Sequence, residues 1–222
     1  MIRLAVLDLA GTTIRDDGAV EGAARDALIE LGVDRDSLAM ANHLATVRAT
    51  MGMSKIVVFR TLLDDEHRAQ RANAAFEEAY AKRVTSGEIE PLPGAAETLS
   101  ELRDRGIRIC LTTGFSDTTR DLIIDHVQWR TMIDLALSPG SGLRGRPAPD
   151  LVLAAVIRLE IDDVRHVAVV GDSVNDLYCG TRAGAGVVAG VLTGAHDRDQ
   201  LAAVPHTHVL ASVADLPAVL DD

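Results

Sequence analysis

Short apolar runs recur along the chain and are separated by longer amphipathic segments. Each run is rich in Val, Ile, Leu and Ala and is apolar on both faces, which is typical of strands buried within a parallel sheet. The strongest runs are Ile2–Leu7, Ile107–Leu111, Val167–Val170 and Val187–Leu192, while the shorter Ile133–Leu137 and His208–Ala211 are candidates for a fifth strand and an edge strand.

Helical spacing appears between these runs. Leu99 and Leu102 share one face of Thr98–Arg105, and Gly106 supplies a stop signal directly after it. Pro149–Leu159 also carries its apolar residues at mostly helical spacing. Because strands alternate with helices, the sequence predicts an α/β protein with a doubly wound parallel sheet.

One stretch breaks this alternation, from about Glu21 to Glu88. It is rich in Ala, Glu and Arg, contains no convincing strand, and carries apolar residues that suggest helices packed on one another. Turn-forming residues flank it, Asp16-Asp17-Gly18 before it and Pro91-Leu92-Pro93-Gly94 after it. We therefore expect a core domain built from residues 1–17 and 91–222, with a helical cap at residues 18–90 inserted after the first strand.

Composition narrows the classes of partner. The chain has 222 residues, a net charge of -11 and only 3% aromatic residues, which argues against nucleic acid as a ligand. The first apolar run is too short to cross a membrane and is interrupted by Asp8. Cys110 and Cys179 lie in apolar segments and suggest no disulfide framework. We expect a cytoplasmic protein that acts on a small molecule, with no nucleic acid or membrane partner and with a homodimer left open.

Polar residues follow the predicted strands at their carboxyl ends, where open parallel sheets bind ligands. Asp8 ends the first strand and precedes Gly11 and Thr12, whose backbone N–H groups can face an anion. Thr113 and Gly114 follow the second strand and can hold phosphoryl oxygens. Turn or helix-capping roles would explain each of these residues taken alone.

Two further segments carry charge. Arg146 lies in a proline-rich loop before a helix, where it could contact a phosphoryl group or simply be a surface residue. Asp172 and Asp176 follow the Val167–Val170 run and offer the hard oxygen ligands that Mg²⁺ prefers, although a capping role is the alternative.

Taken together, Asp8, Thr113, Arg146 and the Asp172/Asp176 pair resemble, in order and spacing, the four motifs of the haloacid dehalogenase superfamily of phosphohydrolases. The resemblance implies that Asp8 attacks phosphorus and forms an aspartyl-phosphate, which water then hydrolyses. It also implies Mg²⁺ as cofactor. The ion would be bound by Asp8, the Ala10 carbonyl and Asp172 with Asp176 close by, while Thr113, Gly114 and Arg146 would hold the phosphoryl oxygens.

Ala10 departs from most phosphatases of that superfamily, which carry a second Asp there as general acid and base. The run Asp8-Leu9-Ala10-Gly11-Thr12-Thr13 is similar to the phosphonoacetaldehyde hydrolase branch, which cleaves a carbon–phosphorus bond through a Schiff base on a cap lysine. Met51-Gly52-Met53-Ser54-Lys55 resembles the segment that bears this lysine. Two positions differ from the branch, because Val58 replaces a His and Phe115 replaces a Tyr.

The missing His removes a base that could deprotonate Lys55, so the lysine could equally bind substrate by its charge. The sequence therefore favours an Mg²⁺-dependent hydrolase of a small phosphorylated metabolite. Carbon–phosphorus cleavage through a Lys55 Schiff base is the first alternative, and a non-catalytic sensor of a phosphorylated or phosphonate metabolite is another. A dehalogenase ranks last, because the Asp172/Asp176 pair indicates a metal that dehalogenation does not need.

Overall fold

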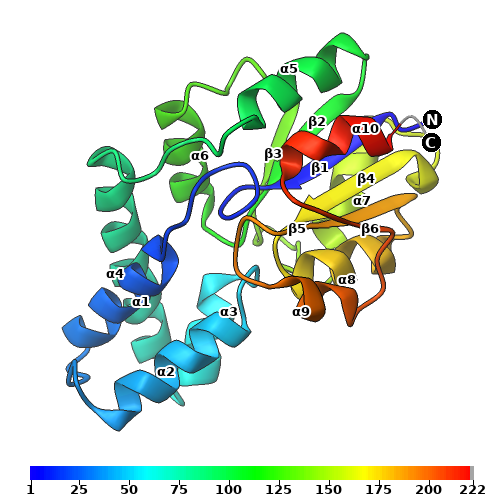
Figure 1. The fold of residues 1–222 in the computed structure, drawn as a ribbon. Coiled ribbons are helices and arrows are strands. Elements are labelled where there is room, and N and C mark those ends of the chain that lie inside the picture. Colours follow the sequence, from blue (N-terminus) through cyan, green and yellow to red (C-terminus); the bar gives the residue numbers. More distant parts are fainter. Residues whose placement is uncertain (221–222) are drawn as a thin grey trace.

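A computed structural model of the chain describes residues 1–220 and shows a six-stranded parallel sheet covered by helices (Figure 1). The strand order is β3-β2-β1-β4-β5-β6, so the central strands are β1 and β4. The predicted α/β class with a parallel sheet is confirmed. The strands are β1 Leu4–Asp8, β2 Arg108–Thr112, β3 Leu135–Leu137, β4 Val167–Gly171, β5 Val187–Val191 and β6 His208–Leu210.

The predicted helical insert after the first strand is confirmed as well. Four helices lie between β1 and α5: α1 Ala19–Glu30, α2 Leu38–Ala49, α3 Lys55–Leu62 and α4 Glu66–Thr85. No helix within residues 1–220 is long and apolar enough to span a bilayer. The remaining helices surround the sheet. They are α5 Ala95–Asp104, α6 Asp117–His126, α7 Asp150–Arg158, α8 Val174–Ala183, α9 Arg198–Ala202 and α10 Leu216–Val219, with short 3₁₀ turns at Val164–His166 and Val213–Asp215.

Side chains that point alternately to the two faces of the sheet divide the core into two layers. In β1, Leu4 and Val6 pack with residues of α7 and α8, whereas Ala5 and Leu7 face the layer that contains α5 and α6. Successive side chains of a strand point to opposite faces, so both faces of the sheet need an apolar cover. This explains why the β1 sequence is apolar at every position before Asp8.

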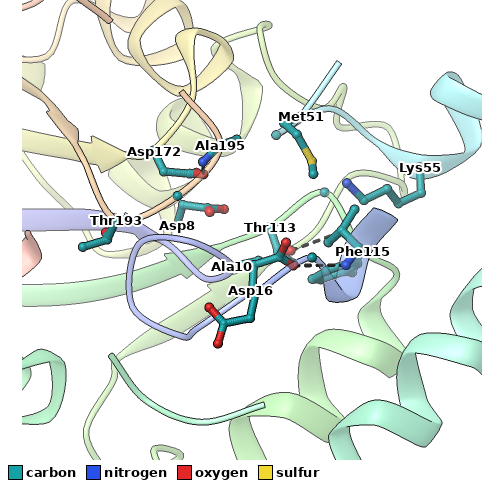
Figure 2. A pocket seen from close by; sticks show the side chains of 16 residues that line it. Asp8, Ala10, Asp16, Met51, Lys55, Thr113, Phe115, Asp172, Thr193 and Ala195 are labelled. Atoms are coloured by element: carbon teal, nitrogen blue, oxygen red, sulfur yellow. Dashed lines mark hydrogen bonds between the residues drawn. The ribbon is translucent and has the colours of Figure 1, made fainter. Parts of the chain in front are cut away.

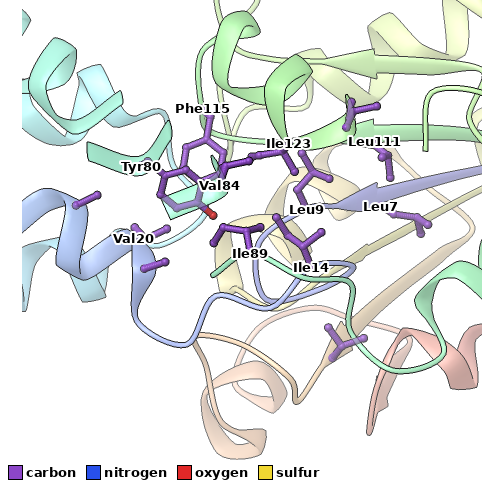
Figure 3. Close-up of a cluster of buried hydrophobic side chains, with 14 of the residues drawn as sticks. Leu7, Leu9, Ile14, Val20, Tyr80, Val84, Ile89, Leu111, Phe115 and Ile123 are labelled. Carbon is purple, nitrogen blue, oxygen red and sulfur yellow. The ribbon is translucent and has the colours of Figure 1, made fainter. Parts of the chain in front are cut away.

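The two linkers between insert and body run side by side. Arg15 donates its backbone N–H to Glu90 over 2.8 Å, and Leu92 donates to Thr13 over 2.9 Å. Figure 3 shows the apolar side chains around this crossing, including Ile14 and Ile89 from the two linkers. The cluster is continuous from the sheet through Phe115, Tyr80 and Val84 into the insert.

A second contact between insert and body involves Glu77 on α4. Its carboxylate accepts hydrogen bonds from the backbone N–H of Ser116 at 3.2 Å and the Ser116 hydroxyl at 2.7 Å, and also from the Thr119 hydroxyl. Both partners belong to the start of α6. The insert is therefore fixed to the body by polar contacts as well as by the shared apolar cluster.

Candidate active site

The carboxyl ends of three adjacent strands meet at one cavity of about 240 Å³, which residues of both body and insert line (Figure 2). Asp8 is the last residue of β1 and pairs with Thr112 of β2, while Leu7 pairs with Val170 of β4. This register places Asp172, two residues beyond Val170, beside Asp8. The expected gathering of polar residues at the strand ends is thus present.

Asp8, Asp172 and Asp176 form a buried cluster in which each offers a carboxylate oxygen, all within 4.8 Å of one another. Burial raises the pKa of Asp8 to about 7, with Arg146 opposing the rise and Asp176 adding to it. Burial also raises the pKa of Asp172, helped by the charges of Asp8 and Asp176. Buried, mutually repelling carboxylates with oxygen donors suit a hard divalent cation such as Mg²⁺, which would relieve the repulsion.

Arg146 is buried beside this cluster, with 3% of its surface exposed. Its Nη2 forms an ion pair with Asp8 Oδ1 over 2.6 Å, and its Nη1 is paired with Asp176. Burial lowers the pKa of Arg146, but the two carboxylates outweigh this effect and raise it. Arg146 is not among the described residues that line the cavity, so its visible role is to neutralise the two aspartates.

Of the four loop residues predicted to bind phosphate, two line the cavity and two are packed inside the fold. Thr113 and Gly114 line the cavity, and the Thr113 hydroxyl accepts a hydrogen bond from the Phe115 N–H at 3.2 Å. Gly11 instead packs against Asp172, where a Cβ would overlap the carboxylate. The Thr12 hydroxyl is fully buried and has no hydrogen-bond partner among residues 1–220.

Sequence reasoning missed the loop after β5. The backbone N–H of Ala195 donates to Asp172 Oδ2 at 2.6 Å, and the Thr193 hydroxyl donates to the Gly11 carbonyl at 2.7 Å. Gly194 lies so close to Asp172 that no side chain would fit. The available signal was another Thr-Gly pair at a strand end, matching Thr113-Gly114.

Lys55 begins α3 in the insert and reaches the cavity with 8% of its surface exposed. Its backbone N–H donates to the Gly114 carbonyl at 3.2 Å, and its Nζ lies 5.4 Å from the ring centroid of Phe115. Among residues 1–220, no acidic side chain lies within 4.0 Å of Nζ. Burial lowers the pKa of Lys55, while the charges of Asp16 and Asp8 oppose that change.

The segment before Lys55 rests directly on the body. Asn175 donates from Nδ2 to the Met51 carbonyl at 2.7 Å. Gly52 adopts a φ of 81°, and a Cβ there would overlap the Ser173 hydroxyl. Met51 lines the cavity. The backbone of this segment therefore fixes where the Lys55 side chain enters the site.

Both departures from the phosphonoacetaldehyde hydrolase pattern are explained by packing. Val58 is 4% exposed and belongs to the apolar core. Phe115 packs against Tyr80 of α4 with ring centroids 4.4 Å apart. Neither position supplies a polar group to the cavity.

Comparisons with known proteins give a consistent picture. The sequence profile of the haloacid dehalogenase-like hydrolases matches residues 2–184. The chain is 31% identical over 209 residues to a phosphonoacetaldehyde hydrolase of Pseudomonas putida, covering 87% of this chain and 74% of that protein. A hydrolase from Pseudomonas syringae has a TM-score of 0.85 at 22% identity, covering 99% of this chain and 98% of its own. A phosphonoacetaldehyde hydrolase like protein from Oleispira antarctica has a TM-score of 0.82 at 22% identity, and the match covers 100% of this chain and 92% of that protein.

Proposed function

Because the chain belongs to the haloacid dehalogenase-like hydrolases, as a phosphohydrolase related to the phosphonatases, we propose that it cleaves the carbon–phosphorus bond of a small aldehyde-bearing phosphonate. The observation that carries this proposal is the Lys55 amine. It is buried, it reaches the cavity that Asp8 also lines, and it has no acidic partner within 4.0 Å among residues 1–220.

In the proposed reaction, Lys55 forms an imine with the aldehyde carbonyl of the substrate. The protonated imine withdraws electrons, so the carbon can leave phosphorus as an enamine while the Asp8 carboxylate attacks phosphorus. The enamine carbon then takes up a proton, and water hydrolyses the resulting iminium, which releases the aldehyde product and frees Lys55. A second water molecule hydrolyses the aspartyl-phosphate on Asp8. No acid is needed at the leaving carbon while the carbon–phosphorus bond breaks. This agrees with Ala10 at the position where phosphatases carry an Asp.

The other site residues prepare the phosphoryl group. Thr113 and Gly114 line the cavity beside Asp8 and would hold phosphoryl oxygens. Mg²⁺, bound by Asp8, Asp172 and the Ala10 carbonyl with Asp176 behind them, would supply positive charge that stabilises the anionic transition state. Arg146 would balance the remaining carboxylate charge. A cavity of about 240 Å³ suits a substrate of only a few carbon atoms.

This proposal reverses the order favoured by the sequence. The objection from sequence was that Val58 leaves Lys55 without a base. Burial lowers the pKa of Lys55, and a more readily deprotonated amine depends less on such a base. Hydrolysis of a phosphate ester, with Lys55 binding substrate by charge, is the second candidate, supported by the apolar packing of Val58. A non-catalytic sensor would bind the same ligands without turnover.

The test is trapping with borohydride. Phosphonoacetaldehyde plus borohydride should leave a stable adduct that peptide mass spectrometry maps to Lys55, and Lys55→Arg should lose turnover because arginine cannot form the imine. Asp8→Asn separates the steps, since it should still be trapped but release no phosphate. A Lys55→Arg variant that keeps most of its activity towards phosphate esters, with no adduct in the wild type, would support the second candidate instead.

A further inference from the structure

Formation of an imine requires a side chain that transfers protons. The two positions where related enzymes carry an Asp or a His cannot supply one in this chain. Ala10 and Val58 have no titratable side chain. The cavity is nevertheless lined by Asp16 and Asp17, in addition to the cluster residues Asp8 and Asp172. The question is whether either additional carboxylate is placed for proton transfer.

Asp17 does not meet the requirement. Its side chain is 71% exposed and lies 3.5 Å from Arg15, so it is largely solvated and already has a charged partner. Asp16, its neighbour, is only partly exposed and has no ion pair with an Arg, Lys or His within 4.0 Å among residues 1–220. Asp16 is therefore the cavity carboxylate outside the metal cluster that is both shielded and unpaired.

The position of Asp16 is fixed by the backbone. Its Oδ1 accepts a hydrogen bond from the Val20 N–H at 3.1 Å, and its own carbonyl accepts from the Ala19 N–H at 2.7 Å. These bonds tie it to the first turn of α1, where the linker enters the insert. Asp16 and Ala10 both line the cavity, and both are labelled in Figure 2.

Asp16 and Lys55 share one cavity without direct contact. Burial raises the pKa of Asp16, while the Val20 N–H and the charge of Lys55 lower it. Of the charges that act on Lys55, Asp16 is the strongest in raising its pKa. Because the two groups are more than 4.0 Å apart, a proton can pass between them only through a water molecule or the substrate in the shared cavity.

We propose that Asp16 is the catalytic residue that moves protons between the Lys55 nitrogen and the carbonyl oxygen of an aldehyde substrate. The proposal rests on the imine chemistry proposed above. The Asp16 carboxylate first takes one proton from the Lys55 ammonium through an intervening water molecule, and the neutral amine then adds to the carbonyl carbon.

The protons balance in the remaining steps. A second proton passes from nitrogen to oxygen and gives the carbinolamine. Protonated Asp16 then returns its proton to the hydroxyl group, which leaves as water while the carbon–nitrogen double bond forms. Two protons have moved from nitrogen to water, one stays on the iminium nitrogen, and Asp16 is again a carboxylate.

Asp16 also caps the first turn of α1, so the test must separate the two roles. Asp16→Asn keeps an oxygen that can accept the Val20 N–H but cannot carry the proton, and Asp16→Ser provides a second capping side chain. Asp17→Asn, in the same loop, is the matched control. Thermal unfolding of each variant reports whether the fold is retained.

The readout is the rate of adduct formation with phosphonoacetaldehyde and borohydride, followed by mass spectrometry across pH. Proton transfer by a placed side chain is typically worth about 10²–10⁴-fold. We therefore expect trapping in Asp16→Asn and Asp16→Ser to slow at least about 100-fold, while Asp17→Asn stays near the wild-type rate. The rise of the wild-type rate with Asp16 ionisation should disappear in both variants. The titratable groups facing Asp16 are Asp17 of the same loop, Lys55 of α3 and Tyr80 of α4.

Two results would overturn the proposal, and they can be told apart. Wild-type rates of trapping in folded Asp16→Asn would leave imine formation intact and reduce Asp16 to a helix cap. No trapping in the wild-type protein would refute imine formation itself, and the role of Asp16 with it.

Discussion

Replacing Asp8 by Asn should stabilise the metal-free protein at neutral and alkaline pH, even though it removes the proposed nucleophile. The pKa of Asp8 is raised from 3.8 to about 7, mainly by burial. The folded state therefore holds a proton more tightly than the unfolded state. The stability that the protein gains from this tighter proton binding at Asp8 is complete below about pH 4, and it is lost as the pH rises through about 7.

The magnitude follows from the pKa. One pKa unit corresponds to about 1.4 kcal/mol, so the ionised Asp8 costs the metal-free folded state roughly 4 kcal/mol. Asn is uncharged at every pH and avoids this cost. We expect wild type and Asp8→Asn to be similar near pH 4 and to differ by roughly 4 kcal/mol above pH 8. For a chain of this size the difference corresponds to roughly 8–16 °C in Tm.

The assay is thermal and denaturant unfolding in excess chelator from pH 4 to 8.5. Asp64→Asn, which changes an exposed carboxylate between α3 and α4, should stay within about 0.5 kcal/mol of wild type at all pH values. Added Mg²⁺ should stabilise the wild type more than Asp8→Asn, because the variant lacks one of the proposed ligands. If Asp8→Asn were less stable than wild type at pH 8 without metal, attraction to Arg146 would outweigh burial and our account would be wrong.

Three further changes test other parts of the site. Lys55→Met should abolish turnover of phosphonoacetaldehyde in a phosphate-release assay while leaving Tm unchanged or higher, because it removes a buried charge; retained turnover would exclude Lys55 as the imine residue. Gly52→Ala should lower Tm by more than Gly32→Ala. An alanine at either positive φ costs about 1–2 kcal/mol of backbone strain, but only at position 52 would the added Cβ also overlap Ser173. Equal losses would mean that the segment moves freely on the body. Glu77→Gln should speed amide exchange at the start of α6 and in the segment before Lys55, since it weakens charge-assisted bonds between insert and body; unchanged exchange would show that the apolar cluster alone holds the insert.

The strands could be predicted from sequence to within about two residues because they are apolar on both faces. The first strand reaches Asp8 rather than ending at Leu7, since pairing with Thr112 continues the ladder by one residue. The Ile133–Leu137 candidate shortens to Leu135–Leu137 at the edge of the sheet. Edge strands have one neighbour and are less constrained by the apolar pattern.

The strand-end logic also located most of the candidate site, because parallel strands bring their carboxyl ends to one edge of the sheet. Asp8, Thr113 and Asp172 meet there as expected. The contribution of Ala195 could not be predicted, because a backbone N–H has no signature in the side-chain sequence. Arg146 pairs with two aspartates instead of lining the open cavity. This arrangement depends on tertiary packing that the spacing of residues alone does not encode.

The apolar cluster that crosses from sheet to insert has a consequence for exchanging parts between relatives. Ile14 and Ile89 are fully buried in the linkers, and Arg15 is hydrogen-bonded to Glu90 across them. A junction placed at the predicted boundaries of residues 18–90 would bring Ile14 of one parent and Ile89 of another into the same buried cluster, where their side chains must fit together. Functional chimaeras should therefore take both linkers from the same parent as the insert, with junctions on the sheet side of Ile14 and Leu92.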